Sequence, residues 1–124
     1  LSGQVKNYLY EPNSSLLKAG AFKSTATRFG LEKLHTSSHL YTSDIGVAVF
    51  PGRSFVVEEV FPYTGKLCKG ISEQIPRANI TVRNFPLSVE ELRKRTKIMD
   101  GGDVYLFATT QADNSKILVK CRKF

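Results

Sequence analysis

Residues 78–99 read ANITVRNFPLSVEELRKRTKIM, and this stretch decides which fold the chain can adopt. Its first part, Ala78 to Phe85, alternates side chains between two faces, which predicts a strand. Ser88 and Glu91 then form an S-x-x-E capping box, which predicts the start of a helix. At 100° per residue the helix would place four residues on one buried face: Val89, Leu92, Thr96 and Met99. The stretch therefore predicts a strand followed by an amphipathic helix.

The flanking segments extend this pair to the order β-α-β-α-β-β. On the N-terminal side, SFVVEEVF (54–61) predicts a strand, and Thr64 would cap a helix from about Gly65 to Gln74. On the C-terminal side, Asp100-Gly101-Gly102 is expected to end the second helical unit in a tight connection. Two strands, 103–109 and 116–124, would follow as a hairpin. This order favours a small α/β (α+β) sandwich in which helices cover one face of a mixed sheet.

The first part of the chain gives weaker signals. A strand is expected over residues 4–10. Glu11-Pro12-Asn13-Ser14 is interpreted as a helix start, followed by an apolar stripe: Leu16, Leu17, Ala21 and Phe22. The Pro-Gly turn within residues 50–53 is the best boundary between two small lobes.

Composition excludes several classes of protein. The 124 residues are 41% hydrophobic and 23% charged, which is typical of a globular chain rather than a disordered one. There is no apolar run of about 18 residues, so no membrane helix is expected, and no signal peptide is visible. Cys68 and Cys121 are interpreted as buried free thiols. We therefore expect a cytoplasmic protein with no membrane partner. The start at Leu1 suggests a fragment of a longer protein or a processed one.

The positive charge is concentrated in the second half. Residues 1–62 carry 6 basic and 5 acidic side chains, whereas residues 63–124 carry 12 and 6. This asymmetry favours a polyanionic partner such as nucleic acid, although a plain solvated surface stays an alternative. The predicted phosphate contacts are Arg83, Arg93, Lys94, Lys97, Lys120 and Arg122. Tyr63 or Tyr105 could stack on bases if exposed.

The sequence contains little that indicates catalysis. Neither a dinucleotide fingerprint, a P-loop nor a nucleophile elbow is present. Adjacent Glu58 and Glu59 would point to opposite faces of a strand. His35 and His39 have i, i+4 spacing, but no third ligand is evident, so a surface loop is favoured over a metal site.

Several longer motifs together cover nearly the whole chain. They are Tyr8-Leu9-Tyr10-Glu11-Pro12-Asn13 with Lys18-Ala19-Gly20, Leu40-Tyr41-Thr42-Ser43-Asp44, Pro51-Gly52-Arg53-Ser54-Phe55, Val82-Arg83-Asn84-Phe85-Pro86 with Leu92-Arg93-Lys94, and Asp100-Gly101-Gly102. The set resembles the C-terminal region of bacterial SAM-dependent methyltransferase-like proteins. The resemblance implies a ferredoxin-like segment over residues 1–45 and a THUMP-like domain over residues 46–124. It adds Arg53 to the candidate contacts.

THUMP domains serve RNA-modifying enzymes as RNA-capture modules, so the implied role is presenting RNA to a methyltransferase. The implied cofactor, SAM, and the implied second partner, an N-terminal methyltransferase domain, belong to the full-length protein. The SAM-binding glycine motif and a catalytic Asn/Asp-Pro-Pro motif are absent from these residues, so this chain alone is expected neither to bind SAM nor to transfer methyl groups. The alternative is a protein-interaction module that docks on its own catalytic domain or forms a dimer. An independent enzyme is the least favoured hypothesis.

Overall fold

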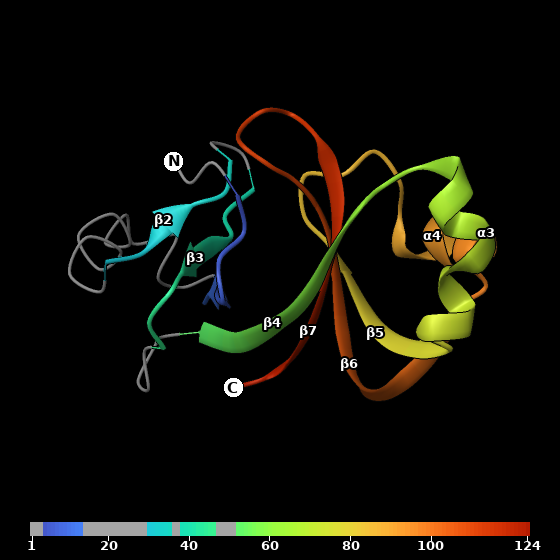
Figure 1. Ribbon diagram of the computed structural model, residues 1–124, viewed down its shortest axis with the longest axis horizontal. Helices are drawn as coiled ribbons and strands as arrows, with labels where there is room; N and C mark the ends of the chain where they lie inside the picture. Colours follow the sequence, from blue (N-terminus) through green and yellow to red (C-terminus); the bar gives the residue numbers. More distant parts are fainter. Residues whose placement is uncertain (1–3, 14–29, 36–37, 47–51) are drawn as a thin grey trace.

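A computed structural model describes residues 4–13, 30–35, 38–46 and 52–124 (Figure 1). These residues form one mixed seven-stranded sheet in the order β2-β3-β1-β4-β7-β6-β5, and two helices pack on it. The strands are β1 (Tyr8–Pro12), β2 (Glu32–Lys33), β3 (Tyr41–Ser43), β4 (Gly52–Pro62), β5 (Arg77–Val82), β6 (Met99–Thr110) and β7 (Lys116–Lys123). The helices are α3 (Gly65–Gln74) and α4 (Val89–Thr96). The predicted α/β class is therefore confirmed. No helix among the described residues is long and apolar enough to cross a membrane.

Both predicted helices of the second half begin at their predicted caps. Thr64 Oγ1 accepts the backbone N–H of Leu67 at 3.1 Å at the start of α3. At the start of α4, Ser88 Oγ accepts the N–H of Glu91, and the Glu91 carboxylate accepts the N–H of Ser88, both at 3.1 Å. Side-chain oxygens thus satisfy amide groups that have no partner within a helix.

The second helix ends earlier than its apolar periodicity predicts. Lys97 adopts a left-handed backbone, φ 66°, and stops α4 after Thr96. The buried residue beyond this turn is Ile98, whereas Met99 is 63% exposed and begins β6. The prediction that Met99 faces the core is wrong, because a 100° rotation per residue no longer applies once the helix has ended.

The Asp100-Gly101-Gly102 segment lies inside β6 instead of before it. Asp100 pairs with Ala78 in β5, but the next residue of β5 pairs with Tyr105, so the chain makes an excursion between these two points. Gly101 and Gly102 carry φ angles of 104° and 81°, which only glycine adopts readily. The predicted helix-to-strand connection is therefore a bulge in a longer strand.

The predicted helix start at residues 11–14 is also corrected. Glu11 and Pro12 belong to β1, where they pair with Arg53 and Gly52 of β4. Proline is tolerated there because β3 pairs with β1 only as far as Tyr10, so the ladder to β3 does not need an N–H from Pro12. The apolar stripe expected within residues 14–29 lies outside the described residues.

The sheet carries a hydrophobic core on each face. Side chains alternate across a strand, so Leu106 and Ala108 of β6 face α3 and α4 while Phe107 faces the opposite side. The core on the opposite side includes Leu34 and Leu40 from the first part of the chain. Figure 1 shows α3 and α4 side by side, away from β2 and β3. Because β4 pairs with both β1 and β7, one strand joins the two parts of the molecule.

Candidate nucleic-acid interface

The first pair of predicted contacts, Arg53 and Arg83, is bound to a single carboxylate. Arg53 Nε donates to Glu11 Oε1 at 2.7 Å, and Arg83 Nη2 lies 2.7 Å from Glu11 Oε2. The Glu11 side chain is only 12% exposed, and the guanidinium of Arg53 also lies 5.3 Å from the centre of the Phe55 ring. These two arginines therefore connect β1, β4 and the end of β5.

A second pair, Lys120 and Arg122, shares Glu58. Both cations lie on one face of β7, as their alternation predicts. Arg122 Nε donates to Glu58 Oε2 at 2.8 Å, and Lys120 Nζ lies 3.8 Å from Oε1. Exposed ion pairs of this kind contribute about 0–1 kcal/mol to stability, so they are weak, but the carboxylate neutralises part of the positive charge.

Arg93 links α4 to the neighbouring strands. Its guanidinium donates to the carbonyl oxygens of Ile98 and Ala78 and to Asp100 Oδ1, at 3.3, 3.2 and 3.0 Å. The side chain is 22% exposed. This residue stabilises the turn after α4, and a phosphate would have to compete with Asp100 for it.

Lys94 and Lys97 differ from the other five predicted contacts. Both are exposed, and neither forms an ion pair with any residue that the structure describes. Their charges are therefore available to a ligand from α4 and its C-terminal cap.

A hollow between α3 and α4 brings further cations together. It has a volume of about 370 Å³ and is lined by Tyr63, Gly65, Cys68, Lys69 and Arg95. Neither Lys69 nor Arg95 is among the contacts predicted from the sequence. Their juxtaposition depends on the packing of α3 against α4, and no local signal in the sequence reports that packing.

Tyr63 and Phe85 form an aromatic pair next to this hollow. Their ring centres are 5.0 Å apart with an edge-to-face angle of 82°. A second hollow, of about 380 Å³, is lined by Asn84, Phe85, Pro86 and Lys116. The other predicted stacking residue, Tyr105, packs against Phe55 in the core with ring centres 5.1 Å apart. Tyr63 is thus the candidate aromatic that lies beside two cations, Lys69 and Arg95.

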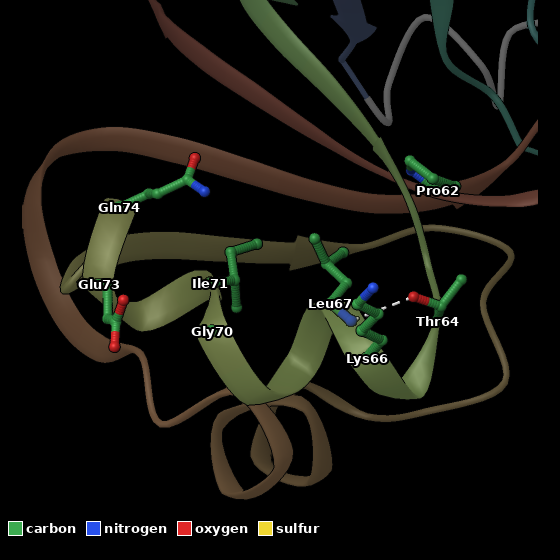
Figure 2. A pocket seen from close by; sticks show the side chains of 8 residues that line it. All are labelled: Pro62, Thr64, Lys66, Leu67, Gly70, Ile71, Glu73 and Gln74. Carbon is green, nitrogen blue, oxygen red and sulfur yellow. Dashed lines mark hydrogen bonds between the residues drawn. The ribbon is translucent and has the colours of Figure 1, made fainter.

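The other side of α3 carries a hollow of mixed character. Figure 2 shows Lys66 near one end of the helix and Glu73 and Gln74 near the other, with Leu67, Gly70 and Ile71 between them. Its volume is about 430 Å³. A carboxylate lines this hollow together with the lysine. It therefore suits a polyanion less well than the hollow lined by Tyr63, Lys69 and Arg95, which we call the Tyr63 hollow.

His35 has two hydrogen-bonding neighbours, and both cysteines are buried. His35 Nε2 lies 2.9 Å from Asn114 Oδ1, and its Nδ1 lies 3.2 Å from Asn84 Nδ2. Over the ranges that the structure describes, no group of three or more His, Cys, Asp or Glu residues could hold a metal ion. Cys68 and Cys121 are free and buried as predicted, and burial raises the pKa of the Cys121 thiol well above its ordinary value, with the charge of Glu58 adding to the shift.

Comparison with known proteins divides the chain into two matched regions. Residues 8–51 match the model of a ferredoxin-like domain, and residues 52–123 match that of THUMP domain-like proteins. The chain is also similar to a crystal structure named "putative methyltransferase from Porphyromonas gingivalis W83", with 50% identity and a TM-score of 0.92 over 98% of this chain. The match covers 30% of that protein, so this chain spans less than a third of its length. No curated protein sequence matches the chain.

Proposed function

Because the chain belongs to the THUMP domain-like family through residues 52–123, we propose that it binds RNA for a larger SAM-dependent methyltransferase. The observation that carries this proposal is the set of cations on α3, α4 and the C-terminal cap of α4 that form no ion pair with any described residue. The similarity to the Porphyromonas gingivalis protein supports the methyltransferase part. The chain itself would be the part that holds the substrate.

Phosphate contacts need only positive side chains that are free to meet the backbone of the nucleic acid. Lys94 and Lys97 meet this requirement, and Lys69 and Arg95 join them. We place the five ion-paired candidates second, because a phosphate must displace Glu11, Glu58 or Asp100 to reach them.

The proposed cofactor, SAM, belongs to the remainder of the full-length protein. The paired glycines Gly101 and Gly102 do not fit a cofactor loop, because they lie in a bulge of β6. A Cβ atom added at either glycine would lie within 3.5 Å of the Arg77 side chain, so that side chain already occupies the space beside them. We therefore derive no catalytic step from these residues.

The proposal is tested by the salt dependence of RNA binding. Fluorescence anisotropy with a labelled RNA hairpin should show binding at low salt that weakens steeply as salt rises, because bound phosphates release counterions. The double variant Lys94→Glu/Lys97→Glu should bind more than tenfold less tightly. Lys123→Glu is the matched control, since this exposed lysine lies at the end of β7, away from both helices (Figure 1). Absence of binding at low salt, or equal losses in both variants, would contradict the proposal.

A protein-docking role is the second candidate, and one surface favours it. Ile45 and Phe124 are 79% and 54% exposed, and the Phe124 ring packs on Tyr8 with ring centres 5.0 Å apart. A Cβ atom added at Gly46 would lie 2.7 Å from the Phe124 ring, so these residues form one apolar patch. If the patch binds a second copy of the chain, sedimentation should show a dimer that Phe124→Ser dissociates. If the wild type and Phe124→Ser both sediment as monomers, the dimer hypothesis is contradicted.

A further inference from the structure

The hollow lined by Tyr63, Gly65, Cys68, Lys69 and Arg95 combines two cations with no carboxylate in its lining. This composition differs from that of three other basic clusters. Arg53 and Arg83 share Glu11, Lys120 and Arg122 share Glu58, and Arg93 contacts Asp100. The positive charge of the Tyr63 hollow is therefore not neutralised by a carboxylate in its own lining.

Tyr63 lines the hollow together with Arg95 and carries no opposing charge. The hydroxyl interacts with the Arg95 guanidinium and with the Cys68 thiol. Burial raises the pKa of Tyr63, and the Cys68 thiol raises it further, against the opposite effect of Arg95. The phenol is therefore neutral at pH 7 and does not neutralise the positive charge of Arg95.

Glu91 is the carboxylate that acts on Arg95 from its own helix. It precedes Arg95 by one helical turn, and its interaction with Arg95 helps to lower its own pKa. The Glu91 carboxylate, however, accepts the backbone N–H of Ser88 at 3.1 Å, and it forms no ion pair with Arg95 within 4 Å. The capping box thus holds this carboxylate at the start of α4 and leaves Arg95 available.

Two cations in one hollow match a dianion better than a monoanion. A phosphate monoester carries about 1.5 to 2 negative charges at pH 7, whereas each phosphodiester of a nucleic-acid backbone carries one. The volume of about 370 Å³ lies at the lower end of the range of ligand pockets, about 300–1,000 Å³. A terminal phosphate with part of its nucleotide suits these dimensions and this charge.

We propose that the Tyr63 hollow is a subsite for a phosphate monoester, with the phosphate held between Lys69 and Arg95. This inference rests on the proposed function, because it assigns the subsite to the phosphorylated end of the bound RNA. A free mononucleotide has the same chemistry, and the experiment below separates the two sources.

The test compares one short single-stranded RNA with a 5′-phosphate and with a 5′-hydroxyl. The wild-type chain should bind the phosphorylated form roughly tenfold more tightly, which corresponds to about 1.4 kcal/mol. Lys69→Gln and Arg95→Gln should each remove this preference, so that each variant binds the two RNAs equally tightly. Tyr63→Phe, which lacks only the hydroxyl that interacts with Arg95, should reduce the preference. Lys123→Gln is the matched control and should leave it unchanged.

The possible outcomes separate the two proposals. Equal binding of both RNAs, or a preference that survives Arg95→Gln, overturns the subsite and leaves the RNA-binding proposal intact. If neither RNA binds, the RNA-binding proposal fails, and titration with adenosine 5′-monophosphate then decides the subsite. Amide shifts centred on Tyr63, Lys69 and Arg95 in NMR spectra would assign the hollow to a free nucleotide. No shifts there would overturn it.

Discussion

Arg83 Nη2 lies 2.7 Å from Glu11 Oε2, and this contact joins the end of β5 to β1 across the molecule. Arg53 binds the other oxygen of the same carboxylate from β4. Glu11 is therefore the common partner of two arginines that arrive from different strands. The Glu11 side chain is only 12% exposed and binds both arginines, so it has a structural role. Its position beside a proline in the sequence does not indicate that role.

Replacing this carboxylate should destabilise the fold. Glu11→Gln keeps the shape of the side chain but leaves Arg53 and Arg83 without their anion. Hydrogen bonds to charged groups contribute about 1.5–3 kcal/mol, so urea unfolding should show a loss in that range. Glu58→Gln is the matched control, and because its pairs are more exposed its loss should be about 0–1 kcal/mol. Equal losses in the two variants would contradict the role given to Glu11.

The capping box of α4 predicts a specific dependence of stability on pH. The backbone N–H of Ser88 bonds to Glu91 and lowers the pKa of its carboxyl below the ordinary value of 4.5. A carboxyl whose pKa is lower in the folded state stabilises the fold above its unfolded pKa, and it loses this contribution as pH falls through the folded value. The melting temperature of the wild type should therefore exceed that of Glu91→Gln at pH 6, and the gap should close toward pH 3. A gap that persists at pH 3 would show that the effect does not depend on ionisation.

Much of the second half was predictable because its signals are local. A cap residue and its partner three positions later define the start of a helix, and Thr64, Ser88 and Glu91 all behave as predicted. The end of α4 was not predictable in this way, because Lys97 is not a residue that normally marks a left-handed turn. Contacts such as Glu11–Arg83 and Lys69 beside Arg95 depend on tertiary packing, so no spacing in the sequence reports them. For the same reason the sequence indicated which residues are basic but not which of them are already paired.

The buried thiol of Cys121 should make the fold sensitive to alkali. Burial raises the pKa of this thiol, and the nearby charge of Glu58 adds to the shift. A group whose folded pKa is raised loses its contribution as pH rises above its unfolded value, about 9.0. Urea unfolding should therefore show that the wild type loses more stability between pH 8 and pH 10 than Cys121→Ala does. The two proteins share every other ionisable group, so the difference between them isolates the thiol. Parallel losses would contradict the assignment.

Alanine substitutions at Gly102 and Gly70 should change stability in opposite directions, because only Gly102, in the β6 bulge, has a left-handed backbone. Gly102 has a φ angle of 81°, and a Cβ atom there would lie 3.4 Å from the Arg77 side chain. Gly102→Ala should therefore destabilise the chain by roughly 1–2 kcal/mol, the cost of a left-handed backbone for a residue with a side chain. Gly70 lies in the middle of α3, where an added Cβ atom would meet nothing within 4 Å. Gly70→Ala should stabilise the chain by about 0.5–1 kcal/mol, because alanine favours a helix interior over glycine. Urea unfolding of both variants measures the two signs, and a stabilising Gly102→Ala would show that this part of β6 does not require the bulge.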